Sequence, residues 1–201
     1  MNIFSNRFRI AAFLAVAAVS LICACQAAAA SAAKETEKLM PPRTAVCFYD
    51  GESFDDLVLN ARGKITFLYV DGKLAGALKR QRQAERSSGG LSGIPPQIFS
   101  YATQSKKKHV LFIARVQALK GWKFDPSMLS AGGYSPVKED IITGISDNPA
   151  VELKFGEREL PKGYNGFIGF FVPVENVKPG ETIKLGYAED RVDWQVPDKN
   201  Q

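Results

Sequence analysis

Apolar residues alternate with polar ones at a period of two through much of the chain after Pro42. In "TIKLGY" (182–187), "RVDWQV" (191–196) and "AVELKF" (150–155), every second residue is large and apolar and lies on the same side. Successive side chains of a β-strand point to opposite faces, whereas a helix would repeat its apolar face every three or four residues. The pattern therefore predicts half-buried β-strands.

Two further stretches are apolar on both faces. These are "KITFLYV" (64–70) and "GFIGFFVPV" (166–174), and the first half of "HVLFIARVQAL" (109–119) resembles them. A strand with two apolar faces is covered on both sides. We therefore expect these three strands to lie in the centre of a sheet.

Turn residues separate the predicted strands. Asp71-Gly72 favours a tight hairpin between 64–70 and a second strand over Lys73–Lys79, and Lys178-Pro179-Gly180-Glu181 favours a type II turn. Another strand is predicted over Ile98–Thr103. Many short strands with regular turns and no clear helix predict an all-β fold, an antiparallel β-sandwich of immunoglobulin-like type. The predicted domain covers 44–197, with a tail over 198–201.

Two long stretches interrupt this pattern. "KRQRQAERSSGGLSGIPP" (79–96) is polar and glycine-rich, and we interpret it as a long mobile loop. "LKGWKFDPSMLSAGGYSP" (119–136) combines turn residues with aromatic ones. Both are predicted to lie outside the strands.

The N-terminus has the three parts of a secretory signal. Arg7 and Arg9 precede an apolar run from Ile10 to Ile22, and small residues follow. A bilayer span takes about 20 apolar residues, more than this run offers. We therefore expect export to the periplasm or beyond the cell.

Two cleavage sites fit the small residues. Ile22-Cys23-Ala24-Cys25 resembles a bacterial lipobox, which would remove 1–24 and leave Cys25 lipidated in an outer-membrane lipoprotein. The "AAAASAA" stretch instead suits an ordinary signal peptidase that removes 1–30. The alanine run after Cys25 favours the soluble form, because lipid linkers tend to be polar. Residues 31–43 are predicted to be a short linker.

Composition limits the partners. Losing Arg7 and Arg9 lowers the formal net charge from +5 to +3, which does not indicate a nucleic-acid-binding protein. Cys47 lies in the apolar stretch "TAVCFYD" and is predicted to be a buried, inert thiol; a reactive thiol is the alternative. The sequence leaves the oligomeric state open.

Residues for catalysis or metal binding are scarce. A serine triad needs an imidazole, and the single histidine, His109, follows three lysines without a Gly-x-Ser-x-Gly motif. A zinc site needs clustered His and Cys ligands, and "YDGESFDD" lacks the spacing of an EF-hand. We expect no cofactor, no metal and no catalytic residue. A hydrolase using two carboxylates remains an alternative, since the fold decides which carboxylates meet.

Two basic groups flank the predicted strand 98–103. One comprises Lys79, Arg80, Arg82 and Arg86, and the other comprises residues 106–109. If one seven-residue strand separates them, they lie about 23 Å apart, which exceeds the roughly 8 Å Debye length at physiological salt. They are therefore predicted to act as separate loop tips.

Aromatic residues are the remaining candidates for binding. Trp122, Phe124 and Tyr134 lie in the second long stretch, and exposed rings are frequent binding anchors. The alternative is that this stretch packs its rings back on the sandwich. The sequence as a whole favours an exported, non-catalytic envelope protein that binds an envelope protein or polysaccharide. A carbohydrate-binding module using the same rings is the second possibility, and membrane contact is expected only through a lipid at Cys25.

Overall fold

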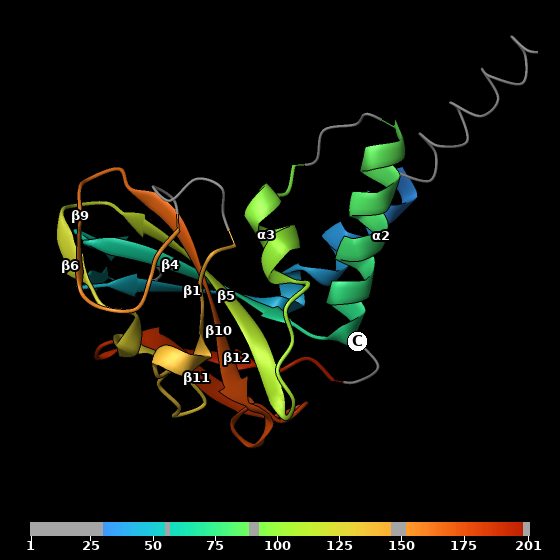
Figure 1. Cartoon of the computed structure of the whole chain (residues 1–201). Helices are drawn as coiled ribbons and strands as arrows, with labels where there is room; N and C mark the ends of the chain where they lie inside the picture. The colour runs from blue at the N-terminus through green and yellow to red at the C-terminus, as the bar shows by residue number, and fades with distance from the viewer. Residues whose placement is uncertain (1–29, 55–56, 89–92, 146–151, 199–201) are drawn as a thin grey trace, which may run out of the picture.

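The computed structural model describes residues 30–54, 57–88, 93–145 and 152–198. The strands form a five-stranded sheet in the order β1-β4-β5-β10-β8, a three-stranded sheet in the order β12-β11-β7, and two short pairs (Figure 1). The named strands pair in antiparallel fashion. The structure is thus mostly β with antiparallel sheets, as the sequence predicts.

The elements have the following bounds. The five-stranded sheet contains β1 (Thr44–Tyr49), β4 (Gly63–Val70), β5 (His109–Ala118), β8 (Ile141–Ile142) and β10 (Asn165–Pro173). The three-stranded sheet contains β7 (Leu129–Ala131), β11 (Thr182–Tyr187) and β12 (Asp190–Gln195). The short pairs are β2 (Glu52–Phe54) with β3 (Leu57–Leu59), and β6 (Trp122–Phe124) with β9 (Arg158–Leu160). The helices are α2 (Gly72–Ser88) and α3 (Pro96–Tyr101), with 3-10 turns η1 (Pro41–Arg43), η2 (Pro126–Met128), η3 (Lys138–Asp140) and η4 (Val174–Asn176).

The strands with two apolar faces occupy the centre of the larger sheet. β4 lies between β1 and β5, and β10 lies between β5 and β8. Pairing of β4 with β5 runs from Gly63 opposite Ala118 to Val70 opposite Leu111. The prediction that both faces of these strands are covered is confirmed, because alternate residues of β4, β5 and β10 belong to two different hydrophobic cores.

The larger core lies between the two main sheets. Ile65, Phe67 and Phe112 point into it from the five-stranded sheet, and Leu185 and Trp194 point into it from β11 and β12. β11 and β12 pack across β1. The larger core therefore lies between two antiparallel sheets.

Helices cover the opposite face of the five-stranded sheet (Figure 1). Leu74 and Leu78 of α2 and Phe99 of α3 belong to the smaller core there. The predicted strands over Lys73–Lys79 and Ile98–Thr103 are therefore wrong, and most of the predicted loop 79–96 is helix up to Ser88.

The hairpin was predicted because Asp71-Gly72 is a common turn sequence. In the structure, the same two residues begin a helix, with Asp71 as its N-cap. The Asp71 carboxylate accepts a hydrogen bond from the Leu74 backbone N–H at 2.8 Å, as an N-cap residue does. Buried residues then follow at helical spacing, namely Leu74, Ala77, Leu78 and Gln81.

The stretch predicted as a linker, 31–43, also contains ordered structure. Residues 30–39 are helical, and Leu39 and Met40 pack against the smaller core. Arg43 is almost fully buried and forms an ion pair with Asp71. Within the described ranges, no helix has the length and apolar character needed to cross a membrane.

Candidate functional site

The aromatic residues proposed as binding anchors are mostly core residues. Trp122 and Phe124 are 3% and 0% exposed. Both rings stack on Tyr187, with centroid distances of 5.3 and 5.1 Å. Rings held in this way cannot face a ligand, so the prediction of exposed anchors is corrected for these two residues in favour of the alternative that the rings pack inward.

Tyr134 is half-buried and holds a buried carboxylate. Its hydroxyl donates a hydrogen bond to Asp140 Oδ2, and Lys106 Nζ donates one to Asp140 Oδ1 at 2.7 Å. The bond to Asp140 raises the pKa of Tyr134 to about 12. Burial alone would raise the pKa of Asp140, but the hydrogen bonds from Lys106 and Tyr134 outweigh it and lower that pKa. This cluster fastens the 119–136 stretch to the loop before β5.

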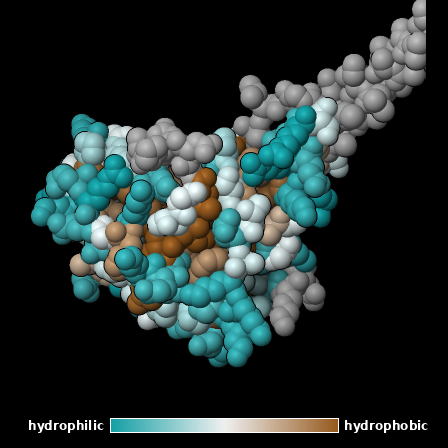
Figure 2. All heavy atoms as spheres, in the orientation of Figure 1, coloured by the Kyte–Doolittle hydropathy of each residue, from teal (hydrophilic) through white to brown (hydrophobic). Residues whose placement is uncertain are grey.

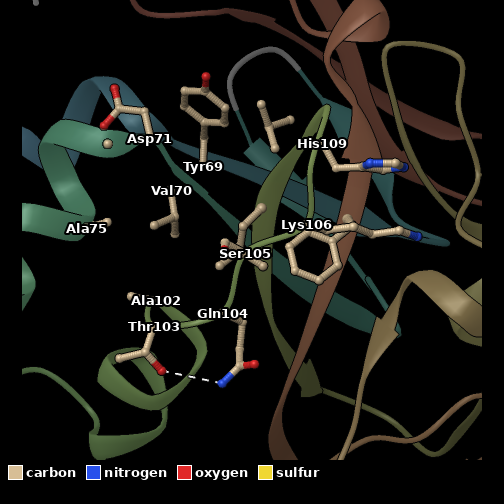
Figure 3. Close-up of a pocket in the computed structure, with 14 residues that line it drawn as sticks. Tyr69, Val70, Asp71, Ala75, Ala102, Thr103, Gln104, Ser105, Lys106 and His109 are labelled. Carbon is tan, nitrogen blue, oxygen red and sulfur yellow. Dashed lines mark hydrogen bonds between the residues drawn. The ribbon is translucent and has the colours of Figure 1, made fainter.

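Two hollows of the helical layer lie elsewhere, along α2. One hollow of about 350 Å³ lies between the start of α2, the 102–106 loop and the ends of β4 and β5 (Figure 3). A second hollow of about 350 Å³ lies between α2 and α3. Both are lined by Ala75, Ala102 and Thr103, so the two hollows are neighbours, and together they are called here the helical groove.

The floor of the helical groove is mainly apolar. Figure 2 shows teal residues along α2 and paler ones between α2 and α3. The apolar lining residues are Val70, Ala75, Leu78, Phe99, Ala102, Leu111 and Phe171. An apolar floor with few polar groups is typical of small-molecule binding sites.

The two ends of the helical groove differ in charge. Lys79 and Arg82 border one end, and the Arg82 guanidinium lies 6.0 Å from the Phe99 ring centroid. Asp71, Lys106 and His109 border the other end. In Figure 3, Asp71 lies on one side of that hollow, and Lys106 and His109 extend away on the other.

Two members of each basic group line these hollows: Lys79 and Arg82 line the one between α2 and α3, and Lys106 and His109 line the one at the start of α2. Ala75 lines the hollow that Lys106 borders, and Arg82 borders the second hollow. The strand that was expected to keep these groups apart is the short helix α3.

A glycine, Gly76, lies in the second turn of α2 and lines the hollow between α2 and α3. Glycine destabilises a helix interior by about 1 kcal/mol relative to alanine. A Cβ atom at Gly76 would meet only the tip of Arg80, with Nη1 at 3.4 Å, and Gly76 has no left-handed backbone conformation. Packing therefore does not require glycine here, and Gly76 is one of the residues that line the hollow between α2 and α3.

The remaining candidates do not form a reactive site. His109 Nδ1 lies 2.8 Å from the Lys107 carbonyl, and since a carbonyl only accepts, this nitrogen carries the proton. Cys47 is 4% exposed, as predicted, and burial raises the pKa of its thiol. No cluster of three metal-ligating side chains occurs among the described residues. Cys25 and the predicted signal lie outside them.

Outside the helical groove, a polar hollow of about 490 Å³ lies beside β7 and β11. It contains two carboxylates, Glu175 and Glu181, and both are exposed. Glu181 lies 3.6 Å from Lys178 Nζ. Catalytic carboxylic acids are usually held in apolar surroundings, which these two lack.

Comparison with protein-family models, curated proteins and solved structures finds no match to the chain. Its function is therefore argued from the helical groove itself.

Proposed function

We propose that the chain is an exported, non-catalytic binding protein of the cell envelope, and that the helical groove is its binding surface. The scaffold would be the immunoglobulin-like sandwich expected from the sequence, extended by α2 and α3. The packing of β11 and β12 across β1 supports the two-sheet part of this description. Export rests on the signal-like N-terminal sequence, with either a free N-terminus near Ser31 or a lipid on Cys25.

The single observation that carries the binding role is Gly76. The chain keeps a destabilising residue in α2 where it lines the hollow between α2 and α3, although the neighbouring atoms leave space for a Cβ. The non-catalytic part is supported by the charged groups at the other end, which already have partners. Asp71 binds Arg43, and Lys106 binds Asp140.

Two measurements test this proposal. The intact mass of the protein from its native cells should show a chain shortened after Ala30 or Ala33, or a lipid adduct on Cys25. An untrimmed chain in the cytosol would contradict export.

The binding role is tested by thermal stability, because a ligand that binds only the folded state raises the melting temperature. Lipid, glycan and protein fractions of the envelope are added separately to the wild-type chain and to Gly76→Leu. We expect at least one fraction to raise the melting temperature of the wild type only. If no fraction does so, the groove is not a binding surface for envelope components.

A further inference from the structure

We propose that the helical groove binds a single-chain anionic lipid, with the acyl chain on the apolar floor and the head group at Lys79 and Arg82. This inference rests on the proposed function, because it names the ligand class for the same groove. It follows from the shape of the floor, the charge at each end and the residues that lie between them.

The floor is mainly apolar, and its uncharged hydrogen-bonding side chains, apart from Tyr69, come from the loop that follows α3, namely Thr103, Gln104 and Ser105. From Gly72 to Arg82 the helix rises about 15 Å, which fits an extended chain better than a compact ring. Between the two ends the groove is lined by Ala75, Gly76, Phe99, Ala102 and Thr103, and the Thr103 hydroxyl already donates a hydrogen bond to the Ser100 carbonyl at 2.8 Å. A sugar or peptide in this position would leave its polar groups unpaired, whereas an acyl chain has none to satisfy.

The charges give the ligand a direction. Among the described residues, neither Lys79 nor Arg82 has a carboxylate partner within ion-pair distance. At the other end, Asp71 places a carboxylate beside the hollow, and Lys106 is already paired with Asp140. A phosphate or carboxylate head group is therefore favoured at the Lys79 and Arg82 end, with the chain directed toward Val70 and Phe171.

Gly76 lies between the head-group end and the deeper floor, and it lets the acyl chain pass. A leucine at this position would stand in the groove, and the surrounding atoms leave room for its first carbon. Gly76→Leu should therefore fold at least as stably as the wild type and yet lose binding. Few substitutions separate binding from folding so clearly.

The experiment compares two lipids with the same acyl chain, palmitoyl lysophosphatidylglycerol and palmitoyl lysophosphatidylcholine, as monomers below the micelle concentration. Titration calorimetry with the 31–201 chain should show at least tenfold tighter binding of the anionic lipid. Gly76→Leu should weaken it more than tenfold without a lower melting temperature. Removing both charges in Lys79→Gln/Arg82→Gln should weaken it about tenfold and leave the zwitterionic lipid unaffected.

Two matched controls accompany these variants. Gly121→Leu adds the same side chain to an exposed glycine beside β6, at the opposite end of the molecule from α2 (Figure 1), where a Cβ would meet only the Leu160 carbonyl oxygen, at 3.8 Å. Lys73→Gln removes one charge from α2 outside the groove lining. Both should bind like the wild type.

Three results would overturn the inference. Equal affinity for the two lipids would show that Lys79 and Arg82 do not bind the anionic head group. Binding to phosphatidylglycerol vesicles without binding of the monomer would indicate attraction to a charged surface and no lipid site. A glycan or protein fraction that raises the melting temperature of the wild type, with no binding of either lipid, would keep the proposed function and reject the lipid.

Discussion

The buried guanidinium of Arg43 donates two hydrogen bonds to one oxygen of Asp71, from Nε at 3.0 Å and from Nη2 at 2.7 Å. A third bond runs from Arg43 Nη1 to the Leu39 carbonyl at 3.0 Å. Asp71 also caps α2. This pair therefore joins the end of the N-terminal helix to the start of α2, the helix that forms one wall of the groove.

Removing the Asp71 carboxylate should be strongly destabilising. Asp71→Ala leaves the Arg43 charge buried without a partner and removes the cap, so we expect a loss of about 3 kcal/mol in the free energy of unfolding. Urea denaturation measures it. Arg62→Ala breaks the exposed pair with Asp50 and is the control, with little change expected. Equal losses in the free energy of unfolding for the two variants would show that the buried Arg43 charge does not need Asp71 as its partner.

Two glycines should respond to alanine in opposite directions. Gly76→Ala should stabilise the fold by about 1 kcal/mol, because helix propensity improves and the new methyl group has space. Gly169→Ala should destabilise by about 1–3 kcal/mol, because its Cβ would lie 2.5 Å from Tyr101 Cδ1. Urea denaturation of both variants tests this. A destabilised Gly76→Ala would mean that packing requires the glycine after all.

Trp122 should behave as a core residue. Trp122→Ala removes a ring that is stacked on Phe124 and Tyr187, so we expect a loss of about 3–5 kcal/mol. Trp122→Phe keeps a six-membered ring there and loses the rest of the indole, including an N–H that has no partner among the described residues, so it should cost less than Trp122→Ala. Thermal unfolding compares the two, and an unchanged melting temperature for Trp122→Ala would place the ring outside the core.

Acid should weaken the fold in part through Asp140. Its pKa in the folded protein is lowered from the ordinary value of 3.8, so its stabilising contribution is complete above that value and is lost as the pH falls through the lower folded-state pKa. Asp140→Asn should be less stable than the wild type at neutral pH and lose less stability on acidification. Urea midpoints at neutral pH and between about pH 5 and pH 2 measure the difference. If the urea midpoints of the wild type and of Asp140→Asn fell by the same amount on acidification, Asp140 would not contribute to the pH dependence.

Alkali should act on Tyr134 in the opposite sense. The bond to Asp140 raises its pKa from 10.0 to about 12, so its contribution is complete below pH 10 and is lost as the pH rises through about 12. Tyr134→Phe should be less stable at neutral pH and lose less stability between these values. Absorbance of the phenolate follows the titration directly. A phenol that ionises at the ordinary pKa in the wild type would exclude the hydrogen bond.

The strands could be predicted because their signal is local. Alternation identified β11 and β12, and apolar residues on both faces identified β4 and β10 as central strands. The Pro179-Gly180 turn also follows the prediction, with Gly180 at a φ of +79° and the Glu181 N–H bonded to the Lys178 carbonyl. In each case backbone preference and burial agree within a few residues.

The groove could not be predicted in this way. The signal that was available is the helical spacing of Leu74, Ala77, Leu78 and Gln81, which competes with a hairpin interpretation of Asp71-Gly72. The apolar residues on both faces of the central strands indicate that each face is covered. They do not indicate which segment of the chain covers the second face. That cover is the helical layer.

By itself, the sequence determined a mostly β chain with antiparallel strands and with β4 and β10 at the centre of a sheet, because strand formation follows from the period of the apolar residues. Only the tertiary structure decided that residues 72–88 and 96–101 are helices, that Trp122 and Phe124 are buried, and that Lys79, Arg82 and Lys106 border one groove. The physical reason is that these outcomes depend on which surface covers the second apolar face of the five-stranded sheet. That choice is made by contacts between residues far apart in the chain.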